Sequence, residues 1–160
     1  MQAFPITATS AAKASLAPAL GVDYGRGRIG LAISDEMGLT ARPLATLTRT
    51  NRQNDLRRLR EIVRKHSVRR IVVGHPLNLD GTASEMTAEV ERFAARIEKH
   101  LGLPVELMDE RLSSWEAEQM IAARPNRNSR KRKRSVDETA AAIILRDFLA
   151  REQSRAVGRS

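Results

Sequence analysis

Hydrophobic positions along the chain fall first into short runs and then into helical stripes. Residues 19–23, 29–34 and 43–47 form runs of apolar and small residues, and the glycine-bearing turn YGRG separates the first two. Short apolar runs that are bounded by turn residues predict strands. We therefore expect the chain to begin with an antiparallel meander.

Beyond residue 50 the pattern alternates between helices and strands. Apolar residues recur at helical spacing in 54–66 and again in 82–101, where Thr82 and Glu85 form a capping box. The segments RRIVVG at 69–74 and LPVELMDE at 103–110 are typical of short buried strands.

Two more helices are expected near the C-terminal end, each after a capping box. The box at 113–116 opens a helix that ends before Pro125, and the box at 135–138 opens a last helix that continues to about Ala150. The order β-β-β-α-β-α-β-α-α predicts an α/β fold in which a mixed five-stranded sheet carries helices on both faces.

Composition narrows the function classes. The 160 residues have the length of one domain, and the absence of cysteine excludes disulfides, thiolate metal sites and cysteine nucleophiles. The longest strongly apolar run, AAAIIL, is too short to cross a bilayer. We expect a disordered tail at 1–18 without a secretory signal, a domain at 19–150, a flexible tail at 151–160, and a cytoplasmic protein.

Positive charge is concentrated in one segment. The chain carries 28 basic and 19 acidic residues, a formal charge of +9, and much of the excess lies in 124–134, at Arg124, Arg127, Arg130, Lys131, Arg132, Lys133 and Arg134. We expect a mobile loop here that contacts a polyanion such as nucleic acid. The simpler interpretation, a solvated run of charge, stays open.

Asp23 is the first of three acids at the ends of predicted elements. It closes the run LGVD on the strand face that otherwise carries the small residues Ala19 and Gly21, which leaves room for a ligand. A buried carboxylate is costly unless a metal, another cation or several hydrogen bonds pair with it. Alternatively, Asp23 only shapes the turn that follows.

The second acidic position lies in MDER, residues 108–111. Successive side chains of a strand point to opposite faces, so only one of Asp109 and Glu110 can enter a given site, and the pattern leaves open which one it is. Alternatively, both are ordinary charges at a strand end, one of them paired with Arg111.

Asp137 is the third acid, in the first turn of the last predicted helix. The helix dipole stabilises a carboxylate at this place, which is one explanation for it. However, Asp137, Ala141, Ile144 and Phe148 follow the spacing of one helix face, which places the acid on the face toward the core.

The three acids predict more together than separately. Clustered carboxylates raise one another's pKa values unless a divalent cation lies among them. Oxygen ligands suit Mg²⁺ or Mn²⁺, and a pair of such ions supports in-line cleavage of phosphodiesters. Because the basic segment directly precedes Asp137, the sequence predicts a metal-dependent nuclease.

Four ordered motifs carry a resemblance to a known family: GVDYGRGRIGLAISD, IVVGHPLNLDGT, LMDERLSS and VDETAAAIIL. Over about residues 20–149 the chain resembles the YqgF family (RuvX type), the pre-16S ribosomal RNA nucleases that are also described as Holliday junction resolvase-like. The resemblance implies a ribonuclease H-like fold and metal-dependent hydrolysis of structured nucleic acid. It also implies a role in maturation of the 5′ end of 16S ribosomal RNA.

Carried over residue by residue, the family's acidic site falls on Asp23, Glu110 and Asp137, with Mg²⁺ or Mn²⁺ as the implied cofactor. Arg28 and Arg111 are implied as groups that contact the substrate or shape the site. His75 stands where the family pattern predicts a hydrophobic residue, in a loop within reach of the site. The predicted nucleic-acid contacts are Arg28, Arg111, Arg127, Arg130, Lys131, Arg132, Lys133 and Arg134.

Other functions remain open. A Holliday junction resolvase acting on branched DNA is favoured if the chain is a homodimer, because such enzymes commonly need two active sites; the sequence does not decide between monomer and homodimer. In a non-catalytic, RNA-binding ribosome-assembly factor the acids are only structural. An ATP-binding kinase-like domain is disfavoured by the short chain and the absence of a GxxxxGK[ST] run.

Two further features are assigned structural roles: Trp115 is interpreted as a packing residue, and GHPLNLDG at 74–81 as a connection between a strand and a helix.

Overall fold

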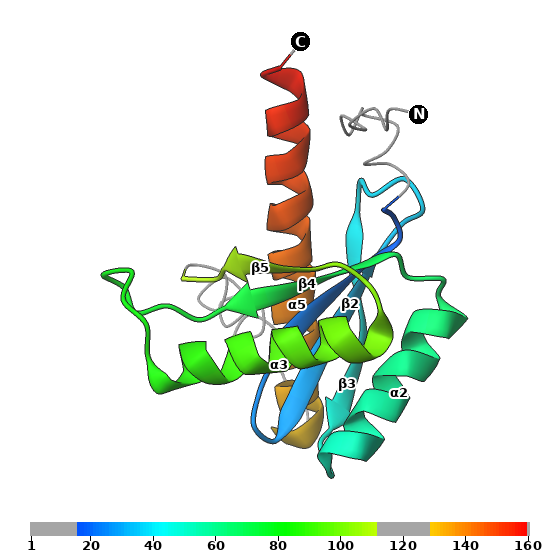
Figure 1. Ribbon diagram of the computed structural model, residues 1–160, viewed down its shortest axis with the longest axis vertical. Helices are drawn as coiled ribbons and strands as arrows, with labels where there is room; N and C mark the ends of the chain where they lie inside the picture. Colours follow the sequence, from blue (N-terminus) through cyan, green and yellow to red (C-terminus); the bar gives the residue numbers. More distant parts are fainter. Residues whose placement is uncertain (1–15, 112–128, 160) are drawn as a thin grey trace, which may run out of the picture.

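The structure is a computed structural model that describes residues 16–111 and 129–159. Within these residues the chain forms five strands and three helices (Figure 1). In chain order they are β1 (Ala19–Tyr24), β2 (Arg28–Ser34), β3 (Ala41–Thr48), α2 (Arg52–Lys65), β4 (Arg70–His75), α3 (Glu85–Leu101), β5 (Val105–Asp109) and α5 (Ser129–Val157).

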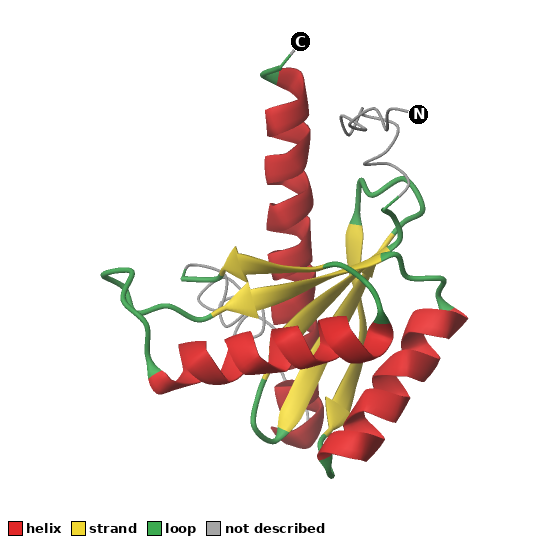
Figure 2. Cartoon of the chain, in the orientation of Figure 1, coloured by secondary structure: helices red, strands yellow, loops and turns green. Residues whose placement is uncertain are grey.

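The strands form one mixed sheet in the order β3-β2-β1-β4-β5 (Figure 2). β1 pairs antiparallel with β2 and β2 antiparallel with β3, whereas β4 is parallel to both β1 and β5. The sheet therefore combines the predicted meander with two parallel strands, and β1 lies at its centre. This confirms the predicted fold class.

Helices cover both faces of the sheet, as predicted: α2 and α3 pack on one face and α5 crosses the other (Figure 1). Side chains of β1 alternate between the two layers. Leu20 and Val22 belong to the core under α2 and α3, and Ala19 belongs to the core under α5. A Cβ at Gly21 would lie 2.8 Å from the carbonyl oxygen of Ala141. The room beside this part of β1, which the sequence suggested for a ligand, is therefore filled by α5.

The start of α3 differs from the prediction. The helix begins at Glu85, and its capping box is formed by Ser84 and Thr87 instead of Thr82 and Glu85. Thr82 is held in the preceding loop, because its hydroxyl and its backbone N–H both donate to the Asp80 carboxylate, at 2.6 and 2.9 Å. The helix ends at Gly102, whose φ of 67° suits a residue without a Cβ.

The last helix is longer in both directions than the sequence predicted. α5 begins at Ser129 and continues to Val157, so Arg130 to Arg134 are helical rather than part of a loop, and 151–157 are helical rather than a tail. The segment contains neither glycine nor proline, and arginine and lysine are good helix formers, so a capping signal inside it does not start a new helix. Residues 124–128 and the helix predicted after 113–116 lie outside the described residues.

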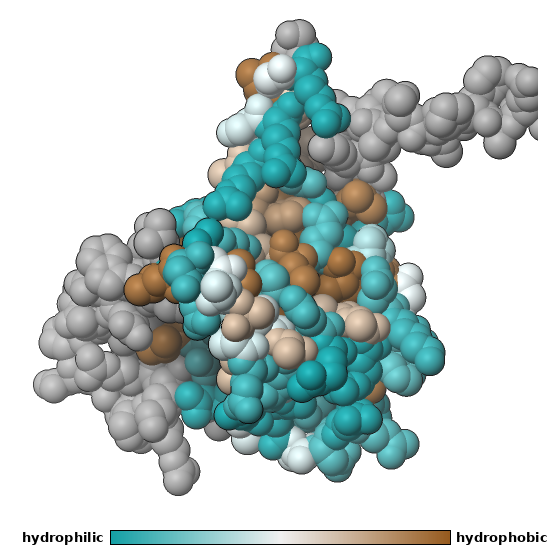
Figure 3. Space-filling model, turned by 60° about the vertical axis from the view of Figure 1, so that its left-hand side comes forward, coloured by the Kyte–Doolittle hydropathy of each residue, from teal (hydrophilic) through white to brown (hydrophobic). Residues whose placement is uncertain are grey.

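The C-terminal turns of α5 project beyond the sheet and are covered mostly by hydrophilic side chains (Figures 1 and 3). No helix within 16–111 and 129–159 has the length and apolar character needed to cross a membrane.

A buried ion pair fixes α5 to β4. Arg70 is 2% exposed, and its two terminal nitrogens donate to the Glu152 carboxylate at 2.8 and 2.5 Å. The guanidinium also lies 4.9 Å from the centre of the Phe148 ring. Removing one partner of such a pair leaves an uncompensated buried charge.

We expect Glu152→Gln to lower the free energy of unfolding by about 3 kcal/mol, measured by urea denaturation. The matched control is Glu61→Gln, because Glu61 pairs with Arg57 on the exposed face of α2 and such pairs contribute about 1 kcal/mol or less. Equal effects of the two substitutions would show that the Arg70 pair does not hold α5 in place.

Candidate active site

Asp23 lies at the centre of the sheet, between two glycines of the neighbouring strands. It is opposite Gly30 in the antiparallel pair with β2. In the parallel pair with β4, Val22 is opposite Val73, so the next positions along the two strands are Asp23 and Gly74. Gly30, Asp23 and Gly74 thus form a row across three strands, on the face that α5 covers.

The two glycines let the other two acids approach Asp23 from opposite sides. A Cβ at Gly30 would overlap the backbone of Asp137 in α5. A Cβ at Gly74 would overlap the carboxylate of Glu110. The structure therefore brings together the three acids that the sequence singled out, and it does so by leaving side chains out at the flanking positions.

Sheet register resolves the choice between Asp109 and Glu110. Met108 is opposite Gly74 and is buried in the core under α5, so Glu110, two residues further on, lies on the same side. Asp109 points to the other face, where its Oδ2 is 2.7 Å from a terminal nitrogen of Arg111. Hydrogen bonding from Arg111 lowers the pKa of Asp109. The residue beside Asp23 is Glu110.

Burial dominates the electrostatics of the two inner acids. It raises the pKa of Asp23 to about 8, and the charges of Glu110 and Asp137 act in the same direction. Burial also raises the pKa of Glu110 to about 7, with His75 opposing the shift and Asp109 adding to it. In the described part of the chain, no basic side chain or hydrogen-bond donor pairs with the carboxylate of Asp23.

Asp137 differs from the other two acids because it has a cationic partner. Arg28 Nε donates to Asp137 Oδ2 at 2.7 Å, and the two side chains are 39% and 19% exposed. The acid lies well inside α5 rather than in its first turn, so the helix dipole does not explain it. The predicted core face is confirmed, because Ala141, Ile144 and Phe148 are buried.

The donors at this site suit a hard divalent cation. Asp23 and Glu110 offer carboxylate oxygens that no described side chain neutralises, which is the ligand chemistry that Mg²⁺ and Mn²⁺ prefer. As the side chains stand, however, no three acidic or histidine residues within 16–111 and 129–159 are grouped so that they hold a metal ion. The carboxylate of Asp137 is instead paired with Arg28.

The remaining predicted site residues lie at varied places. His75 is the last residue of β4 rather than part of a loop. Its Nε2 lies 2.9 Å from Glu91 on α3, yet it is still near enough to Glu110 to oppose the rise in the pKa of that acid. Arg111 is held by Asp109 and also donates to the carbonyl oxygen of Leu79 at 3.4 Å. Arg127 lies outside the described residues. The other predicted basic contacts are in the first turns of α5, at Arg130, Lys131, Arg132, Lys133 and Arg134.

A second polar site was missed by the sequence reasoning. On the face under α2 and α3, a pocket of about 500 Å³ is lined by five arginines and two acids among its ten residues. Part of its lining was visible in the sequence, because Glu89, Arg92 and Arg96 share one face of α3 at helical spacing. The same helix also carries an apolar stripe, and the sequence pattern was interpreted from that stripe alone.

Sheet order and helix placement define a ribonuclease H-like fold. A solved structure described as "T. thermophilus RuvC in complex with Holliday junction substrate" matches with a TM-score of 0.51, at 18% identity, over 84% of this chain and 94% of that chain. At this level of identity the likeness concerns the fold.

Sequence comparison identifies the family of the chain. The family model described as "RuvX: Holliday junction resolvase" matches residues 17–151. A relative from Anaeromyxobacter sp. (strain K), named "Putative pre-16S rRNA nuclease", is 48% identical over 132 residues, which are 82% of this chain and 96% of the relative. A relative of the same name from Syntrophus aciditrophicus is 45% identical over 81% of this chain and 86% of its own length. The chain belongs to the RuvX family.

Proposed function

We propose that the protein is a metal-dependent endonuclease that cleaves structured precursor RNA at the 5′ side of 16S ribosomal RNA, in the cytoplasm. The observation that carries the proposal is the half-buried carboxylate of Asp23, which lies between Glu110 and Asp137 and has no cationic partner among the described residues. The names of the curated relatives support the choice of substrate.

In this proposal Asp23 and Glu110 would hold Mg²⁺ or Mn²⁺, and Asp137 would be a third ligand if Arg28 bound a substrate phosphate in place of its carboxylate. Such a cation would activate the attacking water and stabilise the leaving oxygen. Arg28 is suited to the exchange because a guanidinium binds carboxylate and phosphate in the same bidentate manner. The core under α5, which includes Met108 and Ile144, fixes the part of the sheet that carries both inner acids.

The strand end offers a matched pair of variants for testing the site. We expect Glu110→Gln to lower cleavage at least 100-fold, because it removes an anionic ligand while keeping the shape of the side chain. Asp109→Asn, one residue away on the other face, is expected to keep cleavage within a few-fold of the wild type. Single-turnover cleavage with Mg²⁺ or Mn²⁺, and then with EDTA, measures both effects.

The same assay compares an RNA that carries the 16S 5′ leader with a DNA four-way junction. Cleavage of the RNA that requires both metal and Glu110 supports the proposal. Cleavage of only the junction supports a resolvase, the function in the description of the matching family model. Loss of cleavage in Asp109→Asn with retention in Glu110→Gln would contradict the assignment of the site.

A further inference from the structure

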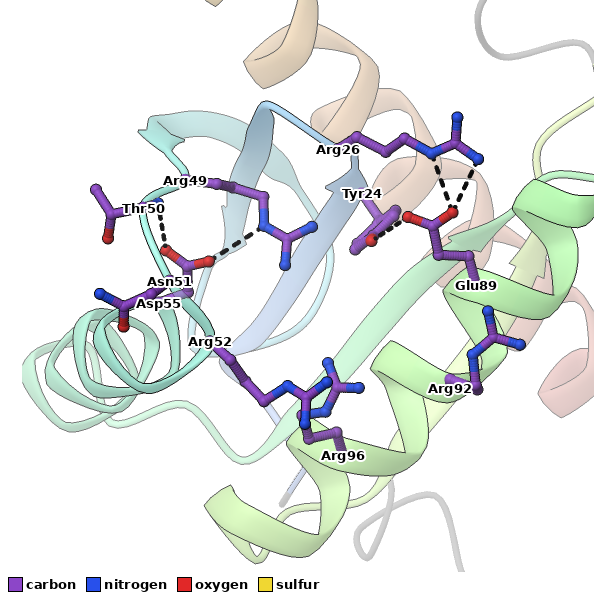
Figure 4. Close-up of a pocket in the computed structure, with 10 residues that line it drawn as sticks. All are labelled: Tyr24, Arg26, Arg49, Thr50, Asn51, Arg52, Asp55, Glu89, Arg92 and Arg96. Atoms are coloured by element: carbon purple, nitrogen blue, oxygen red, sulfur yellow. Dashed lines mark hydrogen bonds and ion pairs between the residues drawn. The ribbon is translucent and has the colours of Figure 1, made fainter.

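We propose that the arginine-lined pocket under α2 and α3 binds backbone phosphates of the nucleic-acid substrate away from the bond that is cleaved. The inference rests on the proposed action on nucleic acid, and it adds a second contact surface on the sheet face opposite the acids. The pocket is formed by Tyr24 at the end of β1, the turn after it, the start of α2, and one face of α3 (Figure 4).

The acids of the pocket are already neutralised by local partners. Asp55 accepts hydrogen bonds from Arg49 Nε at 3.2 Å and from the backbone of Thr50 at 3.1 Å. Glu89 accepts from the hydroxyl of Tyr24 at 2.7 Å and from Arg26 Nε at 3.0 Å. Each carboxylate is thus paired with an arginine beside it, and Glu89 also feels the charge of Arg92 at longer range.

Arginines outnumber acids in the lining by five to two. Within the described residues, no acid lies at ion-pair distance from Arg52, Arg92 or Arg96, although all three line the same pocket. Figure 4 shows Arg52 coming from α2 and Arg96 from α3 toward the space between the two helices. Guanidinium groups that converge in this way repel one another, and a bound polyanion removes the repulsion. The start of α2 adds a weaker attraction for anions.

Location connects the pocket to the acidic site. Tyr24 directly follows Asp23 in β1, so the two side chains point to opposite faces at the same end of the sheet. Arg26 pairs with Glu89 in the pocket, whereas Arg28, two residues later, pairs with Asp137. The Cα atoms of Arg26 and Arg28 are at most about 7 Å apart along the turn. A nucleic acid that passes around this turn reaches both sites.

The pocket matches phosphates better than bases. Its lining offers guanidiniums together with the hydroxyl of Thr50 and the amide of Asn51. The oxygens of these two side chains accept hydrogen bonds from Asn54, which leaves their O–H and N–H groups to donate to phosphate oxygens. The ring of Tyr24 is not free to stack on a base, because the guanidinium of Arg49 lies 4.9 Å from its centre and Phe93 4.8 Å away. We therefore expect the pocket to contribute affinity and salt dependence without sequence preference.

The experiment uses the double variant Arg92→Gln/Arg96→Gln. The matched control is Arg64→Gln/Arg155→Gln, which removes the same charge from exposed positions far from the pocket. Binding of the 16S leader RNA is measured in EDTA over a range of salt concentrations. We expect the pocket variant to bind at least ten-fold more weakly at about 0.1 M salt, and the slope of log K against log salt to fall by about 1.4 to 1.8 for two lost contacts. The control should change the slope by less than half of this.

Cleavage kinetics give a second readout. The pocket variant should raise KM for the long leader RNA while kcat stays within two-fold of the wild type, and a short RNA that covers only the cleaved bond should be unaffected. Equal slopes for pocket variant and control would overturn the inference. So would high-affinity binding of ADP or pyrophosphate that the pocket variant loses while RNA binding is unchanged, because that result defines a small-anion site.

The two proposals fail in different ways. Absence of cleavage by the wild type, with a salt slope that the pocket variant reduces, contradicts the proposed nuclease function and retains the phosphate site. Metal-dependent cleavage with no effect of the pocket variant on affinity contradicts the phosphate site and retains the nuclease.

Discussion

Replacing Asp23 by asparagine is expected to abolish cleavage and, in the absence of divalent cations at pH 8, to stabilise the protein. Both effects come from the same half-buried carboxylate. Burial and the nearby acids raise its pKa to about 8, which means that ionised Asp23 is unfavourable in the folded chain when no cation binds it. Asparagine is close in shape and carries no charge, so it removes this cost together with a metal ligand.

The direction of the pH dependence follows from the raised pKa. The folded chain holds the proton of Asp23 more tightly than the unfolded chain, in which the pKa is near 3.8. The free energy of unfolding of the metal-free wild type therefore decreases as pH rises from about 4 to about 8, by on the order of 1 kcal/mol per pH unit, and then levels off. Asp23→Asn lacks this pH-dependent term in its free energy of unfolding. The stability of Asp23→Asn relative to the wild type should therefore increase as pH rises across the same range.

Thermal unfolding in EDTA at several pH values measures this difference. Asp109→Asn is the control. Because Arg111 lowers the pKa of Asp109, the ionised form of Asp109 is favourable in the folded chain, and removing this carboxylate should not stabilise the protein at pH 8. Addition of Mg²⁺ or Mn²⁺ should raise the Tm of the wild type but not that of Asp23→Asn. A wild type whose stability is flat between pH 5 and pH 8, or equal effects of metal on both proteins, would contradict the buried-carboxylate account.

Local sequence patterns predicted most of the fold. The strands were found because their apolar runs end at glycine-bearing or charged turns, and α3 because Val90, Phe93 and Ile97 follow a helical period and are indeed buried. The start of α5 was placed too late because the Ser135–Glu138 signal falls within a segment that has no helix breaker. A capping motif indicates that a helix can begin, but it does not show that the preceding residues are outside one.

The candidate site was only partly predictable, because its geometry depends on contacts between strands. The sequence indicated Asp23, but the alternation of side chains along a strand did not tell Glu110 from Asp109, and only the family resemblance selected Glu110. The pairing of Met108 with Gly74 resolves this, and register is a property of the assembled sheet. For the same reason the roles of Gly30 and Gly74 were not visible: each matters because of an atom from a distant segment.

Gly30→Ala is the substitution expected to damage both the fold and the site most strongly. The added Cβ would overlap the backbone of Asp137, which has no rotamer by which to move aside, so α5 must shift away from β2. We expect a loss of about 3 kcal/mol in the free energy of unfolding, the upper end of what overpacking commonly costs. The shift also moves Asp137 relative to Asp23, and a displacement of about 1 Å at a catalytic group lowers kcat/KM by about 100-fold.

Two other glycines make this prediction decisive. Gly27→Ala is the control, because nothing lies within 4 Å of its added Cβ, and stability and cleavage should both remain near the wild type. Gly74→Ala acts more on the site than on the fold: its Cβ would meet the carboxylate of Glu110 and lie 2.7 Å from Cδ1 of the buried Ile144, both ends of side chains rather than backbone. We therefore expect cleavage to fall, with a smaller loss of stability than in Gly30→Ala. If Gly30→Ala unfolds at the same urea concentration as Gly27→Ala, α5 does not approach β2 as closely as the structure describes. If Gly74→Ala cleaves at the wild-type rate, Glu110 does not act from the position above Gly74.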